Sequence, residues 1–509
     1  MKRKLYWSLL AVSALCFLGA CGNNQTQKEE TTQQAKMETN TITVGQTWVI
    51  ADDNPLNGGN PWSITSHGIS EYVYMQKEDG TLESRFINTL EQKGDLEWTL
   101  TMKKDAKFSN GDDVKAQDLA TCLNDIIANN KLSRASAGEI KYEATGEYTL
   151  KATTERPTKD LKSILGEWTN VVYKKDNNGK YIFTGPFIIK TLQPKNELTL
   201  QPNKYYPESD KRPDTVIVKA FKDINTLKLA FESGEVDLAL GITGEIAKEL
   251  KEKNKHILDF NAGYQYFTFL NTKNEILSDV KVREALDYAI NRESIKEALF
   301  GGTLPTGLFA HYNAFDTTEK ALYDTQKASQ LLDEAGWKLE SNSKYRQKDG
   351  KELALTIKTY SAKADLPKVS QIIASELEKS GIKTNVEVVD NISEVTKSRE
   401  FDAVVYAQHP SPAGSPVYFL NQFFRTDAPN NFTSYSSVKT NELLDAMGTE
   451  SDTSKLYDLA KQVQKEVLKD RPVLLTMDPQ WHAAVSDNLK NYKLWNGDYY
   501  IVNSSLKVK

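Results

Sequence analysis

From residue 42 onward, the spacing of apolar residues alternates between the period of a strand and that of a helix. Residues 97–102 (EWTLTM) are apolar at every second position, which predicts a strand with one buried face. Residues 111–130 (GDDVKAQDLATCLNDIIANN) begin with acids and then repeat apolar residues at helical spacing, which predicts a helix. The chain is therefore expected to contain both element types.

Strands and helices alternate most clearly in the second half of the chain. Residues 352–390 are predicted to form a strand, a helix and a second strand, and residues 401–406 (FDAVVY) add another strand. Such units place strands in parallel, with ligands at their carboxyl ends. Earlier, residues 66–76 (SHGISEYVYMQ) are predicted as a helix that enters a strand. The pattern predicts an α/β fold.

Two β-rich segments lie where the chain passes between its halves. Residues 262–273 (AGYQYFTFLNTK) leave the first half, and residues 473–486 (VLLTMDPQWHAAVS) return from the second. Two such crossings between two lobes predict a cleft that opens and closes about a hinge.

The N-terminus has the layout of a lipoprotein signal peptide. Residues 2–4 are basic, residues 5–18 are apolar but too few to span a bilayer comfortably, and LGAC ends at Cys21. This pattern predicts a signal peptide over residues 1–20 and a lipid on Cys21. The alternative is an ordinary secretory signal with a chance cysteine.

Residues 21–41 contain almost no apolar side chains, so they are predicted to be a flexible tether. The predicted location is the extracellular face of the cell membrane, with a Gram-positive source indicated by the Lys- and Asn-rich composition. Cys16 leaves with the signal peptide, and Cys122 then lacks a partner, so neither a disulfide nor a CxxC site is expected.

Charge and motifs narrow the function further. The pI of about 5.8 gives no general attraction to nucleic acid. The sequence has no GxSxG, HExxH or Walker motif, so an enzyme is not expected. No cofactor is expected either, and a monomer is the expected state.

Residues 97–119 (EWTLTMKKDAKFSNGDDVKAQDL) resemble the signature of the family 5 extracellular solute-binding proteins. The resemblance spans roughly residues 42–500. Further matching segments, in the order of the family, are TGPFIIK (184–190), NKYYPE (203–208), VREALDYAINRESI (282–295), YDTQKASQLLDEAGW (323–337) and the strand at 401–406.

The resemblance implies two α/β lobes that close over a ligand. Lobe I would consist of residues 42–263 and 483–509, with an inserted subdomain at about 85–185, and lobe II of residues 264–482. Members of the family deliver peptides or nickel to ABC importers, so the implied partners are a membrane permease and its ATPase.

The loop after residues 401–406 bears on the ligand. In peptide-binding members this loop commonly carries an Asp that pairs with the α-ammonium group of the peptide. Here residues 407–416 (AQHPSPAGSP) contain no acid. Nickel or another transition metal, carried as an organic chelate, is therefore the first expectation. A peptide ligand remains the alternative, as does a sensor or adhesin that uses the same fold.

Nickel-binding members use aromatic walls, an Arg for chelator carboxylates and sometimes one His for the metal. No His pair at metal-binding helical spacing is present, so a chelate recognised as a whole is expected. Each candidate could equally have a core or surface role. The candidate metal contacts are His67 and His409, and the other candidate ligand contacts are Trp62, Arg134, Tyr406, Tyr418, Arg425, Trp481 and His482.

Overall fold

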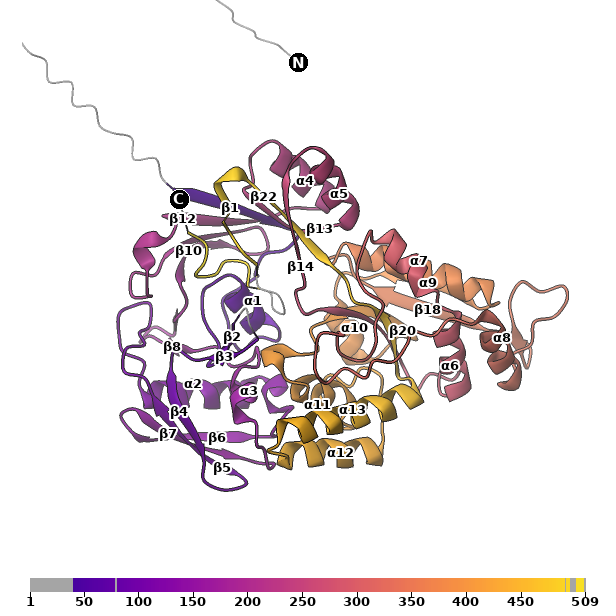
Figure 1. The fold of residues 1–509 in the computed structure, drawn as a ribbon, viewed down its shortest axis with the longest axis horizontal. Helices are drawn as coiled ribbons and strands as arrows, with labels where there is room; N and C mark the ends of the chain where they lie inside the picture. Colours follow the sequence, from indigo (N-terminus) through magenta and orange to yellow (C-terminus); the bar gives the residue numbers. More distant parts are fainter. Residues whose placement is uncertain (1–39, 78–79, 490, 495–499, 508–509) are drawn as a thin grey trace, which may run out of the picture. The chain divides into compact units, whose positions relative to one another are not determined.

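Two β-sheets organise the fold of the computed structural model, which describes residues 40–77, 80–489, 491–494 and 500–507 (Figure 1). The predicted signal peptide, the lipidation site Cys21 and residues 21–39 of the predicted tether lie outside the described residues.

The first sheet has seven strands in the order β10-β11-β12-β1-β13-β22-β14. The central strand β1 pairs in parallel with β12 and β13, and the other pairs are antiparallel. Helices α4 (Ile224–Glu232) and α5 (Gly244–Glu252) pack against the sheet through a small apolar cluster. The strands are β1 (Thr41–Gln46), β10 (Phe187–Gln193), β11 (Glu197–Pro202), β12 (Thr215–Ala220), β13 (Leu238–Ile242), β14 (His256–Phe260) and β22 (Trp481–Val485).

The second sheet has five strands in the order β19-β18-β20-β15-β21. Its alternating side chains enter two different cores: Val405 packs with α6–α9 on one face, and Val404 packs with α11–α13 on the other. The strands are β15 (Gln265–Leu270), β18 (Ala354–Thr359), β19 (Lys383–Val388), β20 (Ala403–Gln408) and β21 (Val473–Met477). The helices are α6 (Val280–Ala289), α7 (Arg292–Ala298), α8 (Thr325–Glu334), α9 (Asp365–Lys379), α11 (Val417–Phe424), α12 (Val438–Thr449) and α13 (Thr453–Asp470).

A separate four-stranded sheet lies within the segment predicted as an inserted subdomain. Its order is β4-β5-β7-β6, and helix α2 (Ala116–Asn129) packs against it. These strands are β4 (Ile87–Gln92), β5 (Glu97–Met102), β6 (Ile140–Gly146) and β7 (Thr149–Thr154). The remaining elements are α1 (Asn60–Ser66), α3 (Leu161–Leu165), α10 (Ile392–Ser398), β2 (Met75–Gln76), β3 (Leu82–Glu83), β8 (Tyr173–Lys175), β9 (Tyr181–Phe183), β16 (Gln347–Lys348) and β17 (Lys351–Glu352).

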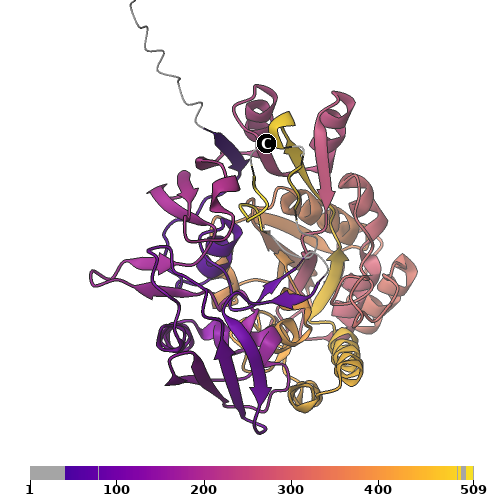
Figure 2. The ribbon, with the colours of Figure 1, turned by 60° about the vertical axis from the view of Figure 1, so that its left-hand side comes forward.

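The chain passes between the two large sheets at β14–β15 and again at β21–β22. Figures 1 and 2 show the second passage in yellow, with β21 in one sheet and β22 in the other. The sequence prediction ends lobe II at residue 482. In the structure, Trp481 and His482 already belong to β22 of the first sheet.

The prediction of a helix within residues 66–76 is wrong, whereas a short strand does form at the end of this segment. Helix α1 ends at Ser66, and only Met75 and Gln76 form a strand. The helix stops because Gly68 is left-handed (φ 67°), so that its N–H bonds the Thr65 carbonyl and the next N–H bonds the Ile64 carbonyl. Because the helix ends at this glycine, the residues that follow it do not continue as a helix.

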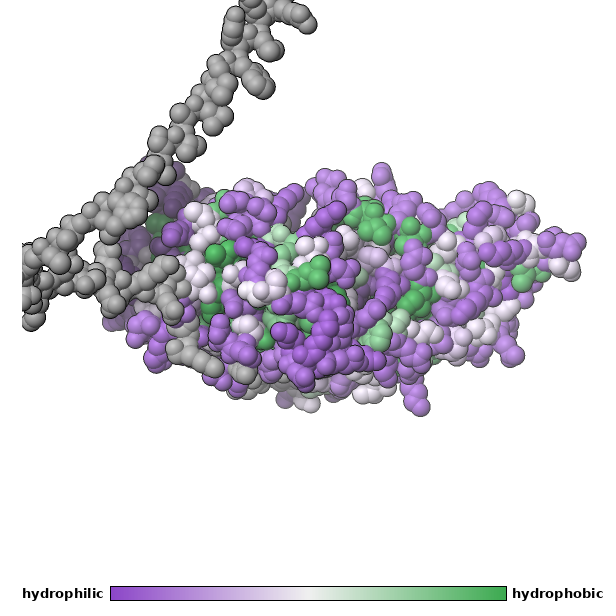
Figure 3. Space-filling model, turned by 90° about the horizontal axis from the view of Figure 1, so that it is seen from above, coloured by the Kyte–Doolittle hydropathy of each residue, from purple (hydrophilic) through white to green (hydrophobic). Residues whose placement is uncertain are grey.

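Polar side chains predominate on the face shown in Figure 3, where apolar side chains form small separate groups. The most exposed large apolar residues come from different elements, such as Leu229 of α4, Val388 of β19 and Val438 of α12. Among the described residues, no helix has both the length and the apolar character needed to cross a membrane.

Gly68 offers a test of this helix end. A Cβ placed on Gly68 would lie 2.1 Å from the Val502 carbonyl oxygen, whereas one on Gly179 (φ 80°) would meet no atom within 4 Å. We expect Gly68→Ala to lower the free energy of unfolding by about 2–5 kcal/mol, since backbone strain and a clash add together. Gly179→Ala should lower it by about 1–2 kcal/mol from backbone strain alone. Urea unfolding measures the free energy of unfolding of both variants. An equal loss of stability in the two variants would show that the clash with the Val502 carbonyl makes no contribution.

Candidate ligand-binding site

A cavity of about 770 Å³ combines apolar and polar walls and is lined by residues of both lobes. This volume falls within the usual range for small-molecule sites. One side comes from residues 48–168 and the other from residues 264–432. Its aromatic lining residues are Trp48, Trp62, Tyr72, Trp168, Tyr264, Tyr360, Tyr406, Tyr418 and Phe432.

Four aromatic rings form a continuous row that begins in the cavity lining, with Trp48, Trp62 and Tyr264, and ends at Trp481 outside that lining. The rings of Trp48 and Trp62 stack with their centroids 5.1 Å apart, and those of Tyr264 and Trp481 stack at 5.0 Å. Trp62 meets Tyr264 edge-on at 6.4 Å, which links the two stacks. Because Trp481 belongs to the first sheet and Tyr264 directly precedes β15 of the second, the row joins the two lobes.

The charged side chains that line this cavity are Lys131, Lys363 and Lys397, and the described lining contains no Asp or Glu. The Nζ atom of Lys363 lies 3.7 Å from the centroid of the Trp481 ring and 5.1 Å from that of Tyr264. Burial lowers the pKa of Lys363 to about 7, although the nearby Asp365 carboxylate favours the charged form.

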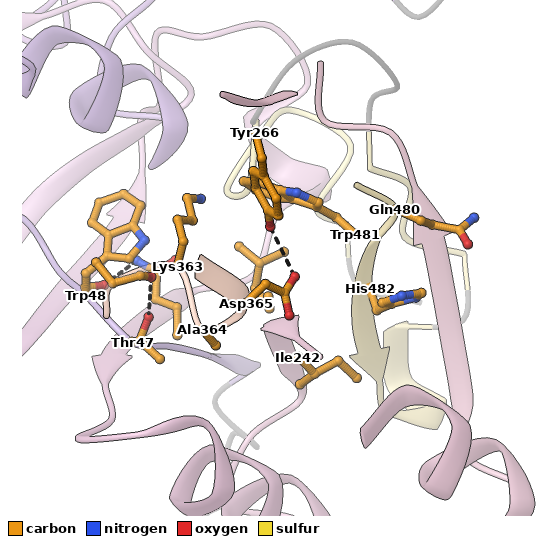
Figure 4. A pocket seen from close by; sticks show the side chains of 14 residues that line it. Thr47, Trp48, Ile242, Tyr266, Lys363, Ala364, Asp365, Gln480, Trp481 and His482 are labelled. Carbon is orange, nitrogen blue, oxygen red and sulfur yellow. Dashed lines mark hydrogen bonds between the residues drawn. The ribbon is translucent and has the colours of Figure 1, made fainter. Parts of the chain in front are cut away.

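A second hollow, of about 30 Å³, adjoins the cavity at Lys363 (Figure 4). This volume suffices for a water molecule and is too small for an organic ligand. In Figure 4 the Tyr266 hydroxyl donates a hydrogen bond to Asp365 Oδ2 at 3.1 Å. Burial raises the pKa of Asp365, and the hydrogen bond from Tyr266 opposes that rise.

Four of the predicted ligand contacts line the large cavity: Trp62, Tyr406, His409 and Tyr418. His409 follows β20, and its ring meets Tyr264 edge-on at 5.4 Å. Tyr418 is part of helix α11 and is buried.

Trp481 and His482 line the smaller hollow. His482 Nδ1 lies 2.7 Å from Asp259 Oδ1, which links β22 to the edge strand β14. Burial disfavours the charged carboxylate of Asp259, but contacts with Lys251 and His482 outweigh burial and lower its pKa. His482 therefore has a partner on its own sheet.

His67 does not line the large cavity. Its side chain is fully buried after α1, where Nδ1 donates to the Ser63 carbonyl at 2.7 Å. Its Nε2 accepts from Gln46 Nε2 at 2.9 Å, and the same amide group donates to the Trp48 carbonyl. With both ring nitrogens engaged, a metal could bind His67 only after these bonds break.

The two predicted arginines also lie away from the cavity lining. Arg134 pairs with Glu139 at 2.8 Å and donates to the Ile127 carbonyl. Arg425 pairs with Asp445 at 2.9 Å and donates to Asn421 Oδ1. Both guanidinium groups are thus used in local structure, and their predicted contacts with chelator carboxylates have no support from this arrangement.

Sequence reasoning missed Trp48, Tyr264 and Lys363. Lys363 lies in the loop after β18, at the carboxyl end of a parallel strand, so the rule that predicts the loop after β20 could also have found it. Among the described residues, no three His, Cys, Asp or Glu side chains gather in a way that could hold a metal ion.

The burial of His67 predicts a pH dependence of stability. Burial lowers its folded-state pKa to about 4, against a backbone hydrogen bond that raises it, while the unfolded chain titrates near 6.5. As the pH falls from about 6.5 to about 4, the unfolded state binds a proton that the folded state does not. This difference should remove about 3 kcal/mol of stability.

Chemical unfolding of wild-type protein and His67→Asn between pH 7 and pH 4 tests this expectation. Asn keeps a donor for the Ser63 carbonyl but does not titrate, so its stability should fall less steeply over this range. His256→Asn, at an exposed position on β14, should keep the wild-type slope. If the stability of His67→Asn falls with pH as steeply as that of the wild type, His67 is not the source of the pH dependence.

Similar proteins include binding proteins for two kinds of solute. The chain is 23% identical over 501 residues to the nickel-binding protein NikA of Staphylococcus aureus (strain NCTC 8325 / PS 47), covering 96% of each chain. It is 25% identical over 539 residues to the oligopeptide-binding protein AppA of Bacillus subtilis (strain 168), covering 97% of each chain.

Solved structures show the same fold. Staphylococcus aureus NikA in complex with Ni(L-His)2 superposes with a TM-score of 0.83 at 21% identity, over 92% of this chain and 100% of that one. This similarity confirms the predicted two-lobed α/β fold. The model of the family described as "Bacterial extracellular solute-binding proteins, family 5 Middle" matches residues 87–431. That match extends over more than half of the sequence, so the chain belongs to the family 5 bacterial extracellular solute-binding proteins.

Proposed function

We propose that this protein is the solute-binding component of an ABC importer and that it captures a transition metal, nickel first, as an organic chelate. The observation that carries the proposal is the large cavity itself. Its wall is aromatic, it contains the imidazole of His409, and its described lining has no carboxylate. The similarity to NikA supports the same choice of ligand.

Each part of such a chelate has a counterpart in this lining. Flat or apolar parts of the chelator would pack against the rings of Trp48, Trp62 and Tyr264. Neutral imidazole is a suitable ligand for nickel, so His409 could complete the coordination of a metal that the chelator already holds. With few histidines and acids nearby, the protein would recognise the chelate as a whole.

Closure would follow from the position of the cavity between the lobes. A ligand that contacts both sides of the lining binds the closed form more tightly than the open form and so favours closure. The closed form would then deliver the ligand to a permease and its ATPase. We propose that the protein acts as a binding protein rather than as an enzyme, and as a monomer held at the outer face of the membrane by lipid on Cys21.

A peptide ligand is the second candidate, because the oligopeptide-binding protein AppA is similar over the same length of chain. An α-ammonium group inside a closed cavity needs a negative partner, since an unpaired buried charge is costly. The described lining offers no carboxylate for that role. A sensor or adhesin that uses the same fold is a third possibility, and unimpaired uptake of every supplied solute after deletion of the gene would favour it.

Calorimetric titration of the purified protein distinguishes the two ligands. We expect heat of binding with nickel plus L-histidine, and little heat with nickel alone or with a mixed peptide library. His409→Ala should weaken binding of the nickel complex at least about tenfold, or about 1.4 kcal/mol, if the imidazole contacts the metal.

His256→Ala provides the control, because His256 is exposed on β14 and does not line the cavity. Its affinity for the nickel complex should equal that of the wild type. If only the peptides give heat of binding, the ligand is a peptide and the proposed metal chelate is wrong.

A further inference from the structure

We infer that Gln46 and His67 are positioning residues for the ligand: they hold the indole rings of Trp48 and Trp62 in place without touching the ligand themselves. Both tryptophans line the large cavity, and neither Gln46 nor His67 does. The expected effect on affinity rests on the proposed function, because it assumes that the ligand packs against these indoles. The position of the indoles can be measured without a ligand.

Trp48 needs side-chain support because it lies in neither a helix nor a strand. Strand β1 ends at Gln46, and Trp48 follows in a stretch without regular structure. Trp62, in contrast, belongs to helix α1. The hydrogen bonds of the sheet therefore do not by themselves set the distance between these two indoles, whose rings stack with centroids 5.1 Å apart.

The amide group of Gln46 connects the backbone of Trp48 to the ring of His67. Its Nε2 atom donates to the Trp48 carbonyl oxygen at 2.5 Å and to His67 Nε2 at 2.9 Å. His67 Nδ1 in turn donates at 2.7 Å to the carbonyl oxygen of Ser63, which follows Trp62 in α1. Three hydrogen bonds thus join the backbone of one tryptophan to the helical turn that carries the other.

The ring of His67 also contacts the indole pair directly. It meets the Trp48 ring edge-on, with centroids 5.1 Å apart and an angle of 72° between the planes. Edge-on and stacked contacts are the favoured arrangements of aromatic rings, and Trp48 makes one of each kind, with His67 and Trp62. Because the His67 ring is fully buried and bonded at both nitrogens, it limits the movement of Trp48.

The burial of Gln46 indicates that its amide serves these contacts. Ile42, Val44 and Gln46 share one buried face of β1, since side chains alternate along a strand. Gln46 Oε1 has no hydrogen-bond partner among the described residues, so the amide acts as a donor. An apolar side chain of the same shape would avoid the cost of this unpaired atom. The strand therefore departs from its apolar pattern where Trp48 needs a donor.

Circular dichroism of the ligand-free protein tests the position of the indoles, because two stacked indoles give a coupled pair of bands. Trp62→Leu removes one ring and defines complete loss of this indole signal. Gln46→Met keeps the shape of the side chain without its donor and should lose much of the signal. The matched control is Gln464→Met, because Gln464 is also buried, donates to the Phe315 carbonyl and does not line the cavity. It should keep the wild-type signal.

Calorimetric titration with nickel plus L-histidine measures the consequence for binding. Gln46→Met should weaken binding about 3- to 10-fold, because the ligand must then order a large side chain that was previously fixed. Gln464→Met should bind as the wild type does, even if its stability falls by as much. Urea unfolding of both variants measures that loss and so separates positioning from a general loss of stability.

Two variants of His67 give a second test should Gln46→Met fail to fold. His67→Gln keeps one acceptor for Gln46 and one donor for the Ser63 carbonyl, so it should retain most of the indole signal and of the affinity. His67→Leu keeps neither and should lose both. Equal behaviour of the two His67 variants would overturn the role of these hydrogen bonds.

The outcomes separate this inference from the proposed function. If peptides bind and nickel complexes do not, the proposed cargo fails, whereas the inference stands provided that Gln46→Met loses the indole signal and binds the peptide more weakly than the wild type. If Gln46→Met keeps the indole signal, or loses it and still binds the nickel complex with wild-type affinity, the inference fails and the proposed cargo stands.

Discussion

The arrangement of the whole binding region depends on how the chain pairs its strands at β21 and β22. These strands are separated by only three residues, yet β21 pairs with β15 of the second sheet and β22 pairs with β13 and β14 of the first. Hydrogen bonds between strands are satisfied only inside a sheet, so this short segment must bridge the lobes. It carries Trp481 to the small hollow beside the large cavity as a direct consequence.

The same crossing explains the row of aromatic rings that begins in the cavity lining. Trp481 stacks on Tyr264, which lies on the other crossing, and Trp62 continues the row into the first lobe. Aromatic rings give a large contact area with few rotatable bonds, so they line a site with little loss of conformational entropy. Only a few polar groups of the lining, chiefly His409 and the lysines, are then left to recognise the polar atoms of a ligand.

Local pattern predicted much of the fold. The strand-helix-strand unit over residues 352–390 forms as β18, α9 and β19, because apolar spacing determines which face of each element is buried. Residues 66–76 did not follow the pattern, since the left-handed Gly68 ends the helix and packs against the distant Val502 carbonyl. That contact joins residues more than four hundred positions apart, and no local pattern contains it.

The sequence by itself determined the family, the α/β class and the absence of an acid in the loop after β20, because each of these depends on residues close together in the chain. Only the tertiary structure decided which side chains meet. It removed His67, Arg134 and Arg425 from the cavity lining, since each satisfies its polar groups with nearby partners. It also brought Lys363 over Trp481, because the pairing of strands in two sheets places the loop after β18 next to the start of β22.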